Sequence, residues 1–212
     1  MSAVEAVVFD LDGVLIDSEQ VWDEVREQLA LERGGRWHEQ AQTDMMGMSS
    51  TEWSRYLHEV IGLAEPPEEL NAEVVRRMQA RYAEHLPLID GAVEASKRLA
   101  EVFRLALASS SNRPLTDAAL ADSSSLRDEG VLERSRARQA CSRRLSEARR
   151  LESAPASCAA VEDSSNGIRA ARAASMRVIA VPTRRYPRLE TPSSLADLVL
   201  DSLAGLTPVV VA

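Results

Sequence analysis

The chain has 212 residues, of which 45% are hydrophobic and 27% are charged, so it can bury a sizeable core and is not expected to be disordered. Its formal net charge of -8 argues against nucleic acid or an anionic membrane as a partner, but not against a small anion held locally. No apolar run reaches a membrane-spanning length and the N-terminus lacks the basic flank of a signal peptide, so we expect a cytoplasmic protein. The two cysteines have no CxxC spacing, which gives no indication of a zinc site or a disulfide framework.

The N-terminal part of the chain contains one expected strand and then only helices. Residues 4–8 form a short β-branched run ended by Asp and Gly, which is typical of a buried strand in a parallel sheet. Helical periodicity follows, and three helices are expected, over residues 18–34, 50–61 and 68–85. A helical block that precedes any second strand indicates an insertion. We therefore assign residues 17–86 to a small α-helical cap domain.

From Leu88 onward, strands and helices alternate. Strands are expected over residues 103–108, 156–161, 177–181 and 198–200, and helices over residues 91–101, 113–120 and 167–174. Such alternation predicts an α/β fold, a Rossmann-like parallel sheet with helices on both faces and right-handed crossovers. The core domain is expected to comprise residues 1–16 and 87–212.

The first chemical motif is Asp10-Leu11-Asp12-Gly13, directly after the first strand. Open α/β sheets bind ligands at the carboxyl ends of their strands. Two carboxylates this close repel each other unless a cation lies between them, and hard oxygen ligands suit Mg²⁺. A carboxylate can also attack a phosphoryl group, while its neighbour two residues on protonates the leaving group. The simpler alternative is that one of these aspartates caps a helix and the other belongs to a turn, with no chemical role for either.

Two further strands are followed by polar residues. The strand ending at Ala108 leads into Ser109, Ser110 and Asn112, where hydroxyls and free N–H groups before a helix can bind an anion. Taken alone, this serine run could simply cap the helix. The strand ending at Val161 leads into Glu162 and Asp163, so neighbouring parallel strands would gather all these groups at one sheet edge.

These segments, read together, resemble the haloacid dehalogenase (HAD) superfamily, and the helical insertion is similar to its beta-phosphoglucomutase-like and sugar-phosphatase branch. The resemblance implies that Asp10 is the nucleophile and Asp12 the general acid/base, and that Ser109 binds the substrate phosphate. Ser110 and Asn112 are further candidate phosphate ligands. The implied Mg²⁺ ligands are the Asp10 carboxylate, the Asp12 backbone carbonyl and the Asp163 carboxylate, with Glu162 assisting.

The expected function is that of a Mg²⁺-dependent phosphatase of small phosphorylated metabolites, such as sugar or polyol phosphates, acting through an aspartyl-phosphate. One alternative is a sugar phosphomutase. The mutases carry an Arg after the Gly-x-Ser turn of the cap, whereas Ser50 follows Gly47-Met48-Ser49 here, which disfavours that alternative. Another is a catalytically impaired homologue that binds phosphate. The oligomeric state and the substrate are left open.

One element of the family pattern is missing from the printed chain. The family has a Lys, sometimes an Arg, between its second and third motifs, usually within Gly-Lys-Pro-x-Pro-Asp, where the cation offsets negative charge at the site. Lys97 is the only lysine of the chain, and it precedes the second motif. Arg136 and Arg138 stand in the expected region, but could replace the lysine only by accident.

A shifted reading frame would account for this gap. The codons CGG CAA GCC TGC TCC CGA CGT CTA TCT encode residues 138–146, and one base later the same string reads Gly-Lys-Pro-Ala-Pro-Asp-Val-Tyr. We chose these codons, so the match shows compatibility with a frameshift and not its presence. The hypothesis is that residues from about 130 to 146 are translated in a shifted frame, with the family register restored at Glu147. The alternative is a genuine basic amphipathic helix in a divergent member.

Overall fold

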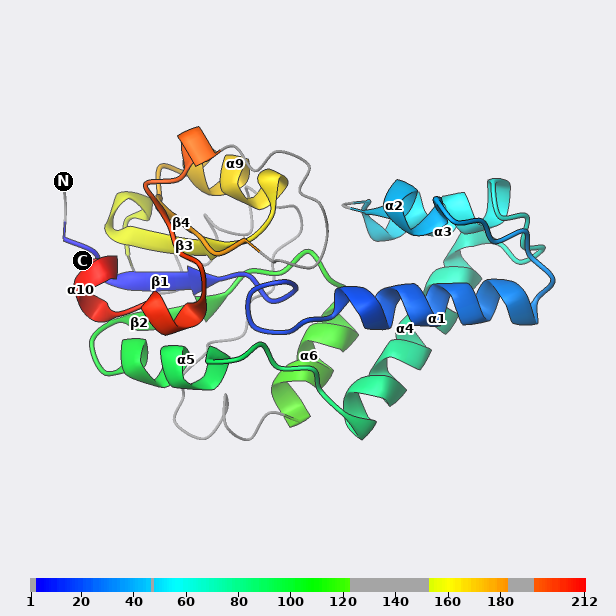
Figure 1. The fold of residues 1–212 in the computed structure, drawn as a ribbon, viewed down its shortest axis with the longest axis horizontal. Coiled ribbons are helices and arrows are strands. Elements are labelled where there is room, and N and C mark those ends of the chain that lie inside the picture. Colours follow the sequence, from blue (N-terminus) through cyan, green and yellow to red (C-terminus); the bar gives the residue numbers. More distant parts are fainter. Residues whose placement is uncertain (1–2, 47, 123–152, 183–192) are drawn as a thin grey trace. The chain divides into compact units, whose positions relative to one another are not determined.

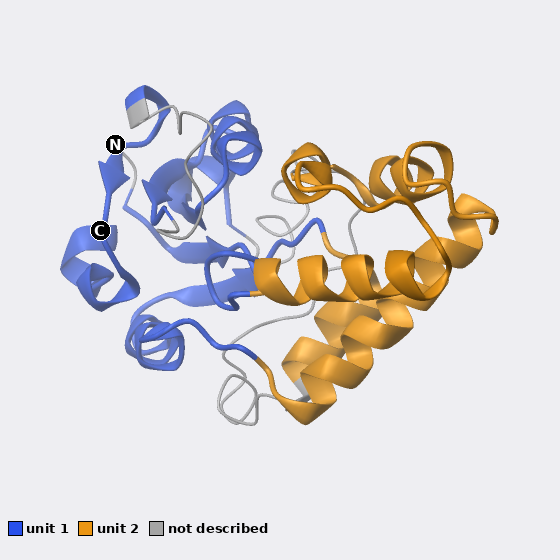
Figure 2. Cartoon of the chain, turned by 45° about the vertical axis from the view of Figure 1, so that its right-hand side comes forward, with its two compact units in different colours: residues 1–17, 87–110, 123–212 blue, residues 18–86, 111–122 orange. Residues whose placement is uncertain are grey.

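A computed structural model describes residues 3–46, 48–122, 153–182 and 193–212 (Figure 1). Within it the chain divides into two units (Figure 2). The sheet unit comprises residues 1–17, 87–110 and 123–212, and the helical unit comprises residues 18–86 and 111–122. None of the helices in the described ranges is long and apolar enough to cross a membrane.

In the described part of the sheet unit, five parallel strands form one sheet in the order β2-β1-β3-β4-β5. The strands are β1 (Ala6–Phe9), β2 (Arg104–Leu107), β3 (Cys158–Glu162), β4 (Arg177–Ala180) and β5 (Leu198–Val199). All four residues of β1 are buried, as expected for a strand covered on both faces. The predicted α/β fold with a parallel sheet is therefore confirmed.

Helices cover both faces of this sheet. α5 (Ala92–Ala100) packs on β2, whereas α9 (Ser165–Ala173) packs on β3 and β4, and Figure 1 shows the two helices on opposite sides. The strand order explains this, because the path from β1 to β2 and the path from β3 to β4 run in opposite directions, and right-handed crossovers then fall on opposite faces. α10 (Pro208–Val211) ends the chain.

Alternate residues of the strands form one buried layer with α9. Many members of this layer are alanines, so the helix can approach the strands closely. The layer comprises Ala6, Val8, Ala106, Ala108, Cys158, Ala160, Ile168, Ala171, Ala174, Met176, Val178 and Ala180. The strand ends that carry the polar motifs are thus fixed by a dense core.

The helical unit is organised around α4. Its helices are α1 (Glu19–Glu32), α2 (Ala41–Met45), α3 (Ser50–Glu59), α4 (Pro67–Glu84) and α6 (Arg113–Asp122). α1, α3 and α6 all pack against α4. α3 begins with a capping box, in which Ser49 and Glu52 satisfy each other's backbone N–H groups.

A buried arginine lies in the interior of the helical unit. The guanidinium carbon of Arg26 lies 4.7 Å from the Trp22 ring centroid and 4.9 Å from that of Trp53. Arg26 is 8% exposed, and such cation–π contacts contribute about 2 kcal/mol when they are desolvated. These tryptophans therefore belong to the packing of this unit.

The expected helices over residues 18–34, 50–61 and 68–85 are confirmed as α1, α3 and α4, each slightly shorter. α2 was not predicted, because five residues are too few to display a helical period. The helical unit contains residues 18–86 and also α6, which the sequence analysis placed with the core. The assignment of residues 17–86 to a separate cap domain stays a prediction.

Candidate active site

Three carboxylates come together where β1 and β3 end. The two strands are parallel and in register, with Phe9 opposite Val161, and the Asp10 backbone N–H donates to the Val161 carbonyl at 3.0 Å. Asp10, Glu162 and Asp163 each offer a carboxylate oxygen, and these oxygens all lie within 4.8 Å of one another. β1 is also the strand at which the sheet order reverses, the usual place for a ligand in this fold class.

Glu162 is held in this cluster by the start of α9. Its carboxylate is buried, with 2% of the residue exposed, and it accepts hydrogen bonds from the Ser164 backbone N–H at 3.2 Å and the Ser164 hydroxyl at 3.1 Å. The Ser164 hydroxyl also accepts from the Gly167 N–H at 3.0 Å and so caps the helix. A Cβ at Gly167 would lie 2.0 Å from the Glu162 carboxyl carbon. The absence of a side chain there leaves room for the acid.

Gly13 plays the corresponding part for Asp163. The turn after β1 is closed by a hydrogen bond from the Gly13 N–H to the Ile16 carbonyl at 2.8 Å, and Gly13 has a φ of +80°. A Cβ at this position would lie 2.1 Å from Oδ2 of Asp163. Glycine therefore serves both the left-handed turn and the close approach of the carboxylate.

Asp12 and Ser109 form a second contact at the same edge. The Ser109 hydroxyl donates to Oδ2 of Asp12 at 3.2 Å. Ser109 follows β2, whose end is tied to β1 by the hydrogen bond from the Ala108 N–H to the Phe9 carbonyl at 2.8 Å. The second motif is thus brought beside the first, as expected from parallel strands that end at one edge.

The other two candidate phosphate ligands are placed differently. Ser110 is exposed. The Asn112 amide forms side-chain hydrogen bonds within the helical unit, accepting from the Ser50 hydroxyl at 2.6 Å and donating to Oδ1 of Asn71 at 2.9 Å. Sequence spacing could not reveal these partners, because they lie on helices far away in the chain. The phosphate-binding roles of Ser109, Ser110 and Asn112 stay predictions.

The carboxylate cluster could hold a divalent metal ion. Ligand oxygens around an octahedral Mg²⁺, at 2.0–2.1 Å from the ion, lie about 2.9 to 4.2 Å apart, so the observed limit of 4.8 Å requires only a small contraction. The donors are hard oxygens, as such an ion requires. A cation would also relieve the repulsion among three neighbouring carboxylates.

Lys97 does not take the place of the catalytic lysine of the family pattern. This residue is exposed in the last turn of α5, and the helix leads into the amino end of β2, opposite to the edge that carries Asp10. Arg136, Arg138 and the proposed frameshift segment lie outside the residues that the structure describes.

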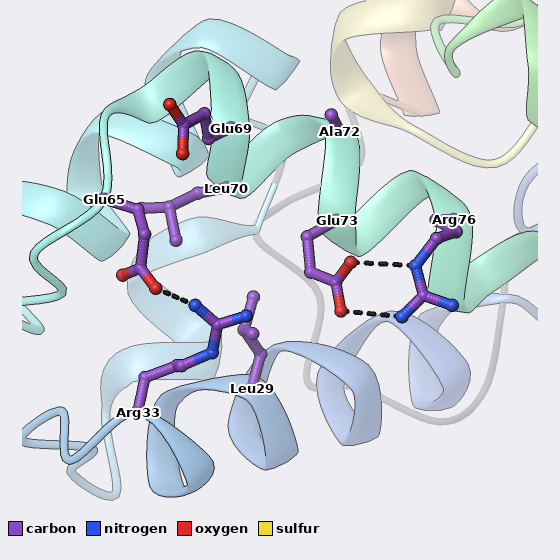
Figure 3. Close-up of a pocket in the computed structure, with 8 residues that line it drawn as sticks. All are labelled: Leu29, Arg33, Glu65, Glu69, Leu70, Ala72, Glu73 and Arg76. Carbon is purple, nitrogen blue, oxygen red and sulfur yellow. Dashed lines mark hydrogen bonds and ion pairs between the residues drawn. The ribbon is translucent and has the colours of Figure 1, made fainter.

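A cavity of about 340 Å³ is found in the helical unit, between α1 and α4 (Figure 3). It is lined by Leu29, Arg33, Glu65, Glu69, Leu70, Ala72, Glu73 and Arg76. Arg33 is paired with Glu65, and Arg76 is paired with Glu73 at 2.8 Å, so both cations are already compensated. Hydrogen bonds from Arg76 and Arg77 lower the pKa of Glu73 to about 2. These pairings do not favour phosphate binding, and we assign the cavity no role in the chemistry.

The model of one known family matches most of the chain. The family is described as haloacid dehalogenase-like hydrolase, and the match covers residues 4–175. The chain belongs to this family. The resemblance deduced from the three motifs is therefore confirmed.

Two curated relatives and one solved structure show how far the similarity extends. Hexitol phosphatase B of Escherichia coli is 32% identical, over 95% of this chain and 94% of that protein. The bifunctional riboflavin kinase/FMN phosphatase of Arabidopsis thaliana is 27% identical over 94% of this chain, which spans only 54% of that protein. CbbY from Rhodobacter sphaeroides in complex with xylulose-(1,5)bisphosphate is 25% identical over 96% of each chain, with a TM-score of 0.75. The HAD assignment rests on the family match, and its sugar-phosphatase branch is supported by these similarities.

Proposed function

We propose that the chain is a phosphoric monoester hydrolase of small phosphorylated metabolites, with sugar and polyol phosphates as the substrate class. The observation that carries the proposal is the cluster of Asp10, Glu162 and Asp163 beside the Asp12–Ser109 contact. The curated phosphatases and the bisphosphate complex named above support the substrate class.

In the proposed first step, a carboxylate oxygen of Asp10 attacks phosphorus. The new bond gives an aspartyl-phosphate, and the bond between phosphorus and the ester oxygen breaks. Asp12, in its protonated form, donates its proton to the leaving alkoxide, which departs as an alcohol. Ser109 donates a hydrogen bond to a phosphoryl oxygen and so orients the group for attack.

The second step returns the enzyme to its starting state. Asp12 is now a carboxylate and accepts a proton from water as the water oxygen bonds to phosphorus. The bond from phosphorus to the Asp10 oxygen breaks, which releases inorganic phosphate and the free carboxylate. A bound Mg²⁺, held by Asp10, the Asp12 carbonyl and Asp163 with Glu162 assisting, would neutralise negative charge on the phosphoryl oxygens and the nucleophile.

Hydrolysis of p-nitrophenyl phosphate tests this proposal. We expect turnover that depends on added Mg²⁺, is removed by a chelator, and is lost in Asp10→Asn. A panel of hexose, pentose and polyol phosphates then identifies the preferred substrate. If the folded wild type releases no more phosphate than Asp10→Asn across the panel, the hydrolase proposal is wrong for this chain.

A second candidate follows from one feature of the sequence. Lys97 is the only lysine of the chain and it precedes the second motif, so the lysine that the family places between its second and third motifs is absent from the printed sequence. A protein with this defect would bind inorganic phosphate without turning over an ester. Phosphate binding by calorimetry with no hydrolysis would support this impaired homologue.

A further inference from the structure

The hydroxyl of Ser164 forms two hydrogen bonds with partners of different kinds. Ser164 is the N-cap of α9, where its Oγ accepts from the Gly167 N–H at 3.0 Å. The same Oγ donates to Oε2 of Glu162 at 3.1 Å. A hydroxyl has a single hydrogen, so the bond from the backbone N–H uses a lone pair and the hydrogen goes to the carboxylate. One side chain therefore joins the start of a helix to an acid of the candidate metal site.

The backbone and the side chain of Glu162 are held by different elements. Its carbonyl accepts from the Val181 N–H at 2.8 Å, and the residue lies opposite Ala180 of β4. Its carboxylate is held by Ser164, whose backbone N–H also donates to Oε2, at 3.2 Å. Loss of the Ser164 hydroxyl would thus loosen the carboxylate while the strand stays paired.

The first turn of α9 also sets the space in which this carboxylate lies. A Cβ at Gly167 would lie 2.0 Å from Oε1 and 2.1 Å from Oε2 of Glu162, so both oxygens lie against the helix. Only 2% of Glu162 is exposed, and a buried charge depends on hydrogen bonds from the protein. The bonds from Ser164 therefore help to fix the direction in which the carboxylate faces.

α9 is a firm support for these bonds. Its residues Ile168 and Ala171 belong to the buried layer shared with the strands, and the Ile168 N–H donates to the Ser164 carbonyl at 2.9 Å. A densely packed helix moves little, because its side chains interdigitate with their neighbours. Ser164 is thus held by the core of the sheet unit.

Orientation matters at this site because three acids would share one ion. The carboxylate oxygens of Asp10, Glu162 and Asp163 lie within 4.8 Å of one another, and carboxylates this close repel each other. Donors that hold one of them in place reduce the rearrangement that metal binding requires, as partners of metal ligands commonly do.

We infer that Ser164 is a positioning residue that couples the first turn of α9 to the metal affinity of the carboxylate cluster. This inference rests on the proposed function, in that the cluster is taken to hold a divalent ion. Coupling between two sites is reciprocal. An ion bound at the cluster should therefore stabilise the first turn of α9 in return.

Magnesium binding by three variants of Ser164 tests the coupling. Ser164→Gly removes the hydroxyl but keeps the backbone N–H, and glycine is nearly as good an N-cap as serine. We expect calorimetry to show a dissociation constant for Mg²⁺ about tenfold higher or more in Ser164→Gly and Ser164→Ala. Ser164→Thr retains a hydroxyl and should stay within about twofold of wild type. In a Glu162→Gln background, Ser164→Ala should have almost no further effect, because Ser164 acts through Glu162.

Ser49→Gly is the matched control for the loss of a serine cap. Ser49 is the N-cap of α3, and its hydroxyl accepts from the Glu52 N–H at 3.4 Å. The Glu52 carboxylate is bonded to the Ser49 backbone N–H at 2.7 Å, which glycine keeps. This variant should bind Mg²⁺ as wild type does.

Amide hydrogen exchange measures the reciprocal effect and requires no catalysis. Added Mg²⁺ should slow exchange in a peptide covering residues 164–168 by about threefold to tenfold in wild type and Ser164→Thr, the range for one hydrogen bond. The slowing should be absent in Ser164→Gly. Peptides covering α5 should be unchanged in all of these proteins.

Three results would overturn the inference. Wild-type Mg²⁺ affinity in Ser164→Gly and Ser164→Ala would show that Glu162 is positioned without the hydroxyl. An equal loss in Ser164→Thr would show that the hydroxyl is not the responsible group. A wild type that binds no Mg²⁺ would remove the coupling altogether. In contrast, a wild type that binds Mg²⁺ but hydrolyses no ester would refute the proposed function, and calorimetry and exchange would still decide the role of Ser164.

Discussion

Replacing Gly13 with alanine is expected to impair metal binding in addition to folding. The φ of +80° at this position costs a residue with a Cβ about 1 to 2 kcal/mol. The added Cβ would also lie 2.1 Å from Oδ2 of Asp163, whereas ordinary contact begins at 3.4 Å. The carboxylate must therefore retreat by about 1.3 Å, the difference between these distances.

A retreat of this size is large on the scale of metal coordination. Ligand distances in protein sites hold to within about 0.2 Å, so Asp163 could no longer contribute at its original position. We expect the dissociation constant for Mg²⁺ to rise at least about tenfold, comparable to the loss of an orienting partner of a ligand.

Gly34→Ala provides the matched control. Gly34 has a φ of +71° just after α1, and a Cβ there would meet nothing within 4 Å. Both variants should lose about 1 to 2 kcal/mol of unfolding free energy in urea without Mg²⁺, while only Gly13→Ala should lose Mg²⁺ affinity by calorimetry. Wild-type Mg²⁺ binding by Gly13→Ala would refute the reasoning, as would an equal loss in Gly34→Ala.

Three further predictions follow from other parts of the chain. Ser175 is exposed with a φ of 61°, so Ser175→Gly should raise the urea unfolding free energy by about 1 kcal/mol; an unchanged midpoint would contradict this. Hydrogen bonds from Arg76 and Arg77 lower the pKa of Glu73 from 4.5 to about 2, so their stabilisation is present above pH 4.5 and is lost as the pH falls toward 2. Across this pH interval, the wild type should therefore lose about 1 kcal/mol more unfolding free energy than Glu73→Gln, a figure reduced for solvent screening. Parallel plots of unfolding free energy against pH for the two proteins would contradict this prediction. Sequencing the gene should show Gly-Lys-Pro-x-Pro-Asp in the neighbouring frame of codons 130–146, and its absence would end the frameshift hypothesis.

Much of the fold follows from local sequence because apolar periodicity and turn residues act over short distances. β1 and the helices α1, α3 and α4 were predicted for this reason. α6 was also predicted as a helix, but its packing on α4 was not, since that contact depends on which surfaces meet in the folded chain. α2 escaped prediction because it makes little more than one turn.

The same distinction, between features set by local sequence and contacts that form only in the folded chain, applies to the candidate site. Asp10, Glu162 and Asp163 each follow a recognisable strand, and parallel pairing is enough to bring strand ends to one edge, so their proximity could be foreseen. The partners of Asn112 could not be foreseen, because Asn71 and Ser50 are 41 and 62 residues away along the chain. The space that Gly13 and Gly167 leave for the carboxylates of Asp163 and Glu162 was likewise invisible in the sequence, because it depends on which side chains approach these glycines in the folded chain.

The position of β1 in the sheet affects when the site can form. β1 is near the N-terminus but lies between β2 and β3, and its pairing with β3 joins Ala6 to Cys158. Such distant pairing is slow, because a long segment of chain must be ordered before the contact forms. Asp10 is therefore synthesised before Glu162 and Asp163 and meets them only after β3 has docked. Acquisition of metal affinity would then mark the completion of folding, and could be followed in time as such.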